Sequence, residues 1–358
     1  MSEDFTLYRG EAGPHPEAEG TEGRAHLVAF RCAHRGAQLS TGWVEGDDLR
    51  CFYHGWKYDG SGSCIEQPAE PEPFCQRIKI RGYPVQEYLG LIFAYLGEGE
   101  PPPMRRFPDF ERGFVIEPCE LEDYPCNYFN RLDNASDGAH VAWTHRESLN
   151  RIAAAAGVPP RPPTAEVRIS EETEYGLRSG TMHNGKPAFQ THLHMPNVNQ
   201  PPSGSRGSLA DGRTLLVDGL YFRVPVDDEN SVSFTVDCVH LTGAEADDYR
   251  ERRRMAQDTK TAALGELSAE ILAGNKVVGD MPGDLSPFQM FWIEDYVAQC
   301  GQGAIADRSH EHLGRSDSGV VSIRQLWARE LKALAEGRPL KQWHTPAGLA
   351  DMIQATNR

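Results

Sequence analysis

Two short motifs near the N-terminus combine cysteine with histidine. Cys32 and His34 are separated by one residue, and Cys51 and His54 are separated by two. The chain has 8 cysteines in 358 residues, too few and too widely spread for a small secreted disulfide scaffold. Cysteines that stand beside histidines at this spacing are more typical of a metal site. We therefore expect these four side chains to bind metal.

Two kinds of metal centre use two cysteines and two histidines. Zinc sites of this composition usually draw two cysteines from one segment and two histidines from another. Rieske [2Fe–2S] centres place two thiolates on one iron and two neutral imidazoles on the other. Here each motif supplies one cysteine and one histidine, in a strand-rich part of the sequence. The spacing therefore favours a Rieske centre over zinc.

A second group of possible ligands lies further along the chain, where Asp137, His140 and His145 follow one another. On a straight α-helix Asp137 and His140 would lie about 60° apart, but the two histidines would lie about 140° apart. Both imidazoles can reach one ion only if the helix ends or bulges between them, as helices often do at functional sites. By itself, the motif also fits a core histidine followed by an exposed one.

The elements that position these motifs fall into two parts. Residues 27–97 contain short apolar runs, such as LVAF and LGLIFAYL, between breaks rich in Gly, Pro and Asp. This pattern predicts a small antiparallel β unit. The stretch 97–110 is rich in Gly and Pro and predicts an extended connection, with a domain boundary near residue 104.

The rest of the chain predicts a sheet with helices. Residues 122–153 predict a loop followed by a helix, and residues 165–242 predict strands, including a hairpin in which GLYFRVPVD and SVSFTVDCVHL flank the turn DDEN. Residues 244–274 and 321–336 predict helices. The expected class is α+β, with an N-terminal antiparallel β domain over 1–104 and an antiparallel sheet with helices over 105–358.

The charge balance excludes two classes of partner. The chain has 36 basic and 52 acidic residues, a formal net charge of −16, which repels nucleic acid and anionic membrane surfaces. Apolar runs fall short of the roughly 18 residues needed to span a bilayer. The start MSEDFTLYRGEAG has no features of a signal peptide. We expect a cytoplasmic protein.

The motifs resemble a known family. FRCAHRGAQLS and RCFYHGWKYDGSGSC resemble the two cluster loops of Rieske non-haem iron oxygenases. The run 307–317 resembles the phthalate dioxygenase and vanillate demethylase branch, which has α subunits only. The resemblance covers nearly the whole chain. It implies that Cys32 and Cys51 bind the buried iron of a [2Fe–2S] cluster, and that His34 and His54 bind the outer iron.

The resemblance also implies a mononuclear Fe(II) site. His140 and His145 match the histidines of a 2-His-1-carboxylate triad, which leaves positions open for O₂ and substrate. The third ligand should be a carboxylate far along the chain, and the candidates are Glu294, Asp295 and Asp307. The family pattern maps best onto Asp295, with Glu294 as the alternative.

Further features follow from the same resemblance. Asp137 matches a carboxylate that bridges the Rieske histidine of a neighbouring subunit and an iron-ligand histidine, which would orient that imidazole and raise its basicity. The second domain should have the helix-grip fold, and the protein should form a homotrimer. An NAD(P)H-dependent reductase, with or without a separate ferredoxin, should supply electrons.

The function implied is oxygenation of an aromatic, carboxylated compound with O₂, by cis-dihydroxylation or by O-demethylation. His192 and His194 are candidates for polar contacts in the substrate pocket. The alternative is a non-catalytic Rieske electron carrier. Iron analysis separates the two, since the oxygenase requires about three irons per chain and the carrier two.

Overall fold

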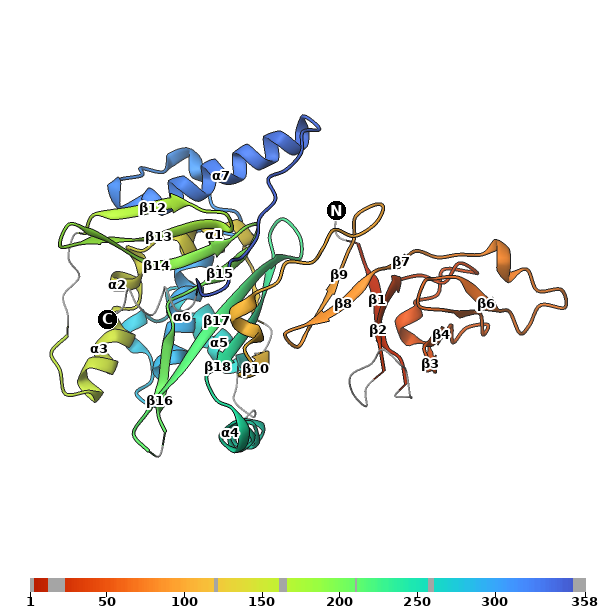
Figure 1. Ribbon diagram of the computed structural model, residues 1–358, viewed down its shortest axis with the longest axis horizontal. Coiled ribbons are helices and arrows are strands. Elements are labelled where there is room, and N and C mark those ends of the chain that lie inside the picture. The colour runs from red at the N-terminus through yellow and green to blue at the C-terminus, as the bar shows by residue number, and fades with distance from the viewer. Residues whose placement is uncertain are drawn as a thin grey trace. The chain divides into compact units, whose positions relative to one another are not determined.

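The computed structural model describes residues 3–11, 23–118, 122–160, 166–209, 211–256 and 261–349. The chain divides into two compact units, Met1–Met104 and Arg105–Arg358, which are coloured red to orange and orange to blue in Figure 1. Among the described helices, none combines the length and the apolar character needed to cross a membrane.

The first unit is built from small antiparallel sheets (Figure 1). One has the order β1-β2-β7, a second has the order β3-β4-β5-β6, and β8 and β9 form a hairpin. The strands are β1 (Phe5–Arg9), β2 (Ala25–Ala29), β3 (Trp43–Glu45), β4 (Asp48–Arg50), β5 (Lys57–Tyr58), β6 (Cys64–Glu66), β7 (Gly82–Tyr83), β8 (Val85–Tyr88) and β9 (Leu91–Ala94). The predicted antiparallel β unit is therefore confirmed.

The core of the first unit includes both cysteines of the Cys–His motifs. Cys32 and Cys51 pack with Val28, Leu39 and Tyr58, all of which are buried. Burial of these apolar side chains stabilises the strands and, with them, the two loops that begin at the cysteines. The loops are thereby anchored at their buried ends.

The second unit contains one large antiparallel sheet, to which nine strands of its described residues belong. Its main order is β10-β18-β17-β15-β14-β13-β12, with β11 paired to β18 and β16 paired to β17. The strands are β10 (Val115–Pro118), β11 (Glu122–Tyr124), β12 (Arg168–Glu172), β13 (Gly176–His183), β14 (Lys186–His194), β15 (Val198–Gln200), β16 (Gly204–Ser208), β17 (Thr214–Pro225) and β18 (Ser231–Val239).

The predicted hairpin at DDEN is the longest pairing in this sheet. Strands β17 and β18 pair from Val217 with Val239 to Pro225 with Ser231. Asp227 closes the turn, because its Oδ1 accepts hydrogen bonds from the backbone N of Glu229 at 2.8 Å and of Asn230 at 2.7 Å. Aspartate favours turns through such bonds to the backbone that follows it.

Helices cover the sheet, which confirms the α+β class. They are α1 (Tyr128–Ser136), α2 (His140–Thr144), α3 (Arg146–Ala155), α4 (Gly243–Ala256), α5 (Thr261–Leu272), α6 (Pro287–Cys300) and α7 (Ser318–Ala335). Helices α1 and α7 pack against β13 and β14, with Leu132 and Ile323 buried against Leu177 and Leu193 (Figure 1). The segment for which one helix was predicted contains three.

Helix α6 is fixed at its start by a capping box. Gln289 N donates to Ser286 Oγ at 3.3 Å, and Ser286 N donates to Gln289 Oε1 at 2.9 Å. Pro287 occupies the first turn, where its missing N–H costs no hydrogen bond. Met290 and Ile293 bury one side of the helix in a cluster with α5. These contacts set the rotation of α6 and therefore the directions of its polar side chains.

Candidate metal centres

The two Cys–His loops of the first unit have matching backbone hydrogen bonds. Gly36 N donates to Cys32 O at 3.0 Å, and Cys32 N donates to Ala37 O at 2.8 Å. The second loop repeats both bonds, at 3.0 and 2.9 Å, around Cys51 and Gly55. The two glycines have φ values of 71° and 76°. Each loop therefore turns back in a conformation that side chains with a Cβ rarely adopt.

These loops separate the sulfur donors from the nitrogen donors. Cys32 and Cys51 are 3% and 2% exposed. His34 and His54 are only partly buried, and their ring centroids lie 4.6 Å apart. A Rieske cluster needs two thiolates on an inner iron and two imidazoles on an outer iron. The four side chains fit that group.

Two aromatic residues support the cluster loops. The hydroxyl of Tyr58 lies 3.2 Å from Cys32 Sγ and accepts a hydrogen bond from Ala33 N at 3.2 Å. Burial raises the pKa of Tyr58 far above its ordinary value, so the hydroxyl keeps its proton and can donate it to a thiolate. Trp56 is buried and stacks on His34, with ring centroids 4.5 Å apart, so it packs against a candidate cluster ligand.

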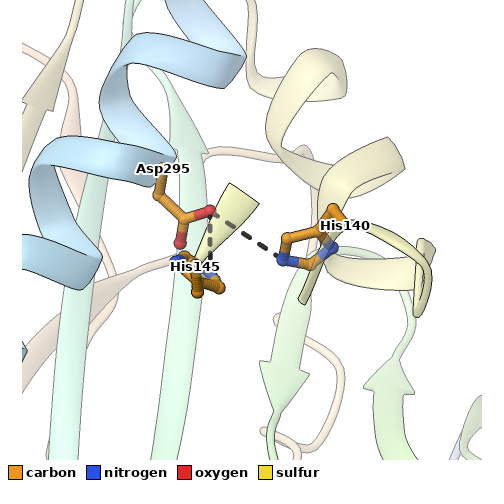
Figure 2. A group of neighbouring side chains, drawn as sticks. All are labelled: His140, His145 and Asp295. Atoms are coloured by element: carbon orange, nitrogen blue, oxygen red, sulfur yellow. Dashed lines mark ion pairs between the residues drawn. The ribbon is translucent and has the colours of Figure 1, made fainter. Parts of the chain in front are cut away.

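In the second unit His140, His145 and Asp295 converge (Figure 2). Asp295 Oδ1 lies 3.9 Å from His140 Nε2 and 3.5 Å from His145 Nε2. One ligand atom from each of the three residues lies within 4.8 Å of the others. Donors that bind one ion at about 2.1 Å are typically separated by about 3.0–3.4 Å. A small inward movement would suffice to bind a divalent metal.

A break between two helices allows the histidines to converge. Helix α2 begins at His140 and ends at Thr144, and α3 begins at Arg146. His145 lies between them with φ −90° and ψ 22°, outside the dihedral angles of a regular helix. The chain therefore changes direction at the second histidine, as the spacing of the motif requires.

The acids Glu294 and Asp295 contact opposite sides of His145. Glu294 Oε2 lies 3.0 Å from Nδ1 of His145, whereas Asp295 lies on the Nε2 side. Glu294 is buried and also accepts hydrogen bonds from the backbone N of Ser148 at 3.1 Å and from its hydroxyl. It orients the imidazole so that Nε2 is available to a metal. The geometry favours Asp295 over Glu294 as the third ligand.

Asp137 contacts His140 through its backbone. Its carbonyl oxygen meets His140 Nδ1, and its carboxylate accepts a hydrogen bond from Ala139 N at 2.7 Å. The sequence-based hypothesis instead had the carboxylate contact the imidazole. Either contact fixes the proton on Nδ1 and leaves Nε2 for the metal.

Asn134 also belongs to this site, although the sequence motif did not identify it. Its Nδ2 donates to Asp295 Oδ1 at 3.2 Å. The preceding residue, Asp133, accepts hydrogen bonds from Arg308 at 3.0 Å and from Arg324 at 2.6 Å. Helix α1 is thus anchored by one residue and contacts the metal site with the next.

Three other candidates lie apart from the convergent group. Asp307 is exposed and accepts hydrogen bonds from Ser309 N and Oγ at 2.9 and 2.7 Å. His192 bonds to the hydroxyl of Tyr175 at 2.6 Å, and His194 bonds to Gln200 Oε1 at 2.8 Å. Neither histidine lines the cavity beside Asp295. Their contacts are those of packed core residues.

Comparison with known proteins identifies the class. Residues 1–88 match the family model of the Rieske [2Fe–2S] domain. The fold resembles that of a solved oxygenase and ferredoxin complex of carbazole 1,9a-dioxygenase, with a TM-score of 0.55 at 18% identity over 98% of this chain and 93% of that chain. The chain therefore contains a Rieske [2Fe–2S] domain, and over nearly its whole length it is similar to the oxygenase alpha subunits of Rieske non-haem iron oxygenases.

Two relatives make the resemblance more specific. One is the 5,5'-dehydrodivanillate O-demethylase oxygenase subunit of Sphingobium sp. (strain NBRC 103272 / SYK-6), 27% identical over 95% of this chain and 72% of the relative. The other is the phthalate 4,5-dioxygenase oxygenase subunit of Pseudomonas putida, 26% identical over 88% of this chain and 74% of the relative. Both alignments extend over both units of the chain.

Proposed function

We propose that this protein is the terminal component of an oxygenase that inserts oxygen from O₂ into an aromatic, carboxylated substrate. The observation that carries this proposal is the convergence of His140, His145 and Asp295 in a chain that also has a Rieske domain. A simple electron carrier has no use for a second site with two imidazoles and one carboxylate.

The side chains of the second unit hold and orient the ligands. His140 and His145 each bond a partner through Nδ1 and present Nε2 to the same point. Asp295 completes the ligand set, and Asn134 holds its Oδ1. When bound, the mononuclear iron supplies O₂ activation and the [2Fe–2S] cluster supplies the electrons. Ligands on one side leave positions open for O₂ beside the substrate.

Electrons would enter from outside the chain. We propose an NAD(P)H-dependent reductase, with or without a ferredoxin; the similar carbazole 1,9a-dioxygenase oxygenase was solved with a ferredoxin. In the homotrimer that we propose, Asp137 would link the Rieske histidine of one subunit to His140 of the next. Its carboxylate already bonds beside His140, at the amide of Ala139.

The relatives support the substrate class. One is named for O-demethylation of dehydrodivanillate and the other for dioxygenation of phthalate, and both compounds are aromatic acids. Both reactions would use the same two metal centres, and the position of the substrate would decide which of its carbons is oxidised. The proposal therefore includes both reactions.

Iron analysis and product identification test the proposal together. The purified protein should contain about three irons per chain, and His140→Ala should contain about two while keeping the absorbance of the cluster. With a reductase and O₂, benzoates with and without methoxy groups should give catechols, phenols or cis-diols. Two irons in the wild-type protein, with no oxidised product, would support the electron carrier instead.

A further inference from the structure

A cavity of about 100 Å³ adjoins the metal site. Asp295 lies at its boundary with the metal site, and Phe291, another lining residue, contacts His145 with ring centroids 4.5 Å apart. An engineered cavity of about 150 Å³ is known to hold benzene. The space beside Asp295 can therefore accept a polar group and part of an aromatic ring.

Three residues that line this cavity each have a buried donor atom without a hydrogen-bond partner. These atoms are Nη1 of Arg131, Nε of Arg223 and Nε1 of Trp292. Arg131 and Arg223 are 2% and 8% exposed. A buried N–H group without an acceptor costs about 1–3 kcal/mol. All the unpartnered polar atoms on the described lining residues are donors, so a ligand that reaches them after a small side-chain movement must offer an acceptor.

One further nitrogen of each arginine donates a hydrogen bond. Arg131 Nε donates to Gln299 Oε1 at 3.0 Å, and its guanidinium stacks on Tyr124 with 3.3 Å from Cζ to the ring centroid. Arg223 Nη1 donates to Ser233 Oγ at 2.6 Å. The unpartnered atoms thus belong to restrained side chains, which lose little conformational entropy on binding a ligand.

Two guanidinium groups and three carboxylates line the cavity, so the local charge favours an anion only when a divalent metal at Asp295 offsets the acids. Glu122 is the acid paired with both arginines, and its Oε2 lies 3.6 Å from Arg131 and 3.9 Å from Arg223, beyond hydrogen-bond distance. Asp237 lines the cavity too but has a contact of its own, and Asp295 faces the metal position. Burial and repulsion from Arg131 lower the pKa of Arg223 to about 10, so the guanidinium remains charged at neutral pH.

We propose that Arg131 and Arg223, assisted by Trp292, bind the carboxylate of the substrate and so direct its ring toward the metal site. This inference rests on the function proposed above and assigns the residues that select an anionic substrate. Guanidinium groups match a carboxylate in geometry and charge. Phe291 and Trp292 supply the apolar wall against which the ring would lie.

Binding measurements on the iron-loaded protein, without turnover, test this proposal. The probes are 4-methoxybenzoate, benzoate and phthalate, each paired with its uncharged amide, and affinity is measured by calorimetry. The wild-type protein should bind at least one acid tenfold or more tightly than its amide. Arg223→Gln should weaken binding of that acid by about tenfold to a hundredfold and leave the amide unchanged. Arg213→Gln removes an exposed charge and serves as the matched control.

A second variant guards against simple misfolding. Glu122→Gln removes the anion that competes for both arginines, so it should tighten binding of the acid severalfold, a change that a damaged fold does not produce. The assignment is wrong if no acid binds more tightly than its amide. It is also wrong if Glu122→Gln weakens binding of the acid. If only neutral aromatics are oxidised, the anion site is wrong and the proposed oxygenase function stands. If acids bind but nothing is oxidised, the anion site stands and the oxygenase function is wrong.

Discussion

Nδ1 of His145 lies 3.0 Å from Oε2 of Glu294, and the next residue of α6 lies on the other side of the same imidazole. Consecutive helical residues point about 100° apart, so two neighbouring acids can approach one ring from two directions. Glu294 would fix the proton, and Asp295 would contribute an oxygen to the proposed metal. The local sequence Glu-Asp would therefore supply both an orienting group and a ligand.

Glu294→Gln tests this division of roles. Glutamine retains an acceptor for Ser148 N but loses the charge that holds the imidazole proton, so the affinity of the mononuclear site for Fe(II) should fall about 10- to 100-fold. The cluster should remain intact. Iron retention during dialysis against chelators of graded strength measures the change. Asp295→Asn is the reference for loss of a ligand, and equal iron retention in Glu294→Gln and wild type would contradict the role of Glu294.

Asp137→Asn should separate electron transfer from iron binding. Asparagine keeps an acceptor for Ala139 N and should preserve the start of α2, while the charge of the proposed bridge is lost. Both metal centres should stay occupied. Re-oxidation of a pre-reduced Rieske centre with substrate and O₂ should slow by orders of magnitude, as measured by its absorbance in a single turnover. Re-oxidation at the wild-type rate with product formation argues against the bridge, and loss of the mononuclear iron argues for a structural role.

Tyr58→Phe should make the cluster harder to reduce. The variant removes the hydroxyl that lies 3.2 Å from Cys32 Sγ, and a donor to sulfur stabilises the added electron. A loss of about 1.4 kcal/mol corresponds to about 60 mV for one electron, so the potential should fall by up to that amount. A redox titration measures it. Tyr53→Phe, at an exposed tyrosine beside His54, is the control and should leave the potential unchanged.

Asp133→Asn should destabilise the second unit. The carboxylate is largely buried between Arg308 and Arg324, whose side chains are 29% and 21% exposed. Loss of one partner from a fully buried pair costs about 3–5 kcal/mol, and partial exposure reduces the expected cost to about 2 kcal/mol. Urea denaturation followed by tryptophan fluorescence measures the change. Glu311→Gln, which removes a more exposed partner of Arg324, should cost less than about 1 kcal/mol.

Lowering the pH should reduce the free energy of unfolding of the second unit, because the unit contains buried histidines. Burial lowers the pKa of His192 to about 4 and of His194 to about 3. In the unfolded chain a histidine has a pKa of about 6.5, so it binds a proton before the buried histidines of the folded chain do as the pH falls. The contribution of these histidines to the free energy of unfolding is therefore fully present above about pH 6.5 and is lost progressively below it. Between pH 7.5 and 5.5, each histidine should remove about 1.4 kcal/mol from the free energy of unfolding. His192→Gln should reduce this loss by about that amount; an unchanged pH dependence would be inconsistent with a buried neutral imidazole.

The sequence predicted those features that depend on local spacing. The two Cys–His motifs, the Asp-x-x-His-x₄-His motif and the DDEN hairpin are each contained in a short segment whose residue types restrict what it can do. The break at His145 was required by geometry, because a regular helix separates the two imidazoles by about 140°.

Other site features depend on contacts between distant segments. Tyr58 reaches Cys32 through strand register, and Asn134 reaches Asp295 across 161 positions. Arg131 and Arg223 look like ordinary surface charges in the sequence and become buried only when α1 packs on β17. The choice between Glu294 and Asp295 depends on the rotation of α6, which its capping box and apolar side set. Periodicity alone does not specify these relationships.

Helix α6 carries Asp295 at the metal position and Phe291 and Trp292 on the cavity wall, whereas Arg223 and Glu122 come from strands. Part of the proposed substrate site therefore lies on strands, whereas Arg131 in α1 and Trp292 in α6 connect it to the helices of the candidate metal site. Substitutions in β11 and β17 can exchange one class of substrate for another while the metal-binding helix is kept. Substitutions in α6 change metal binding and substrate selectivity together, so variation that creates new substrate ranges should concentrate on the strands.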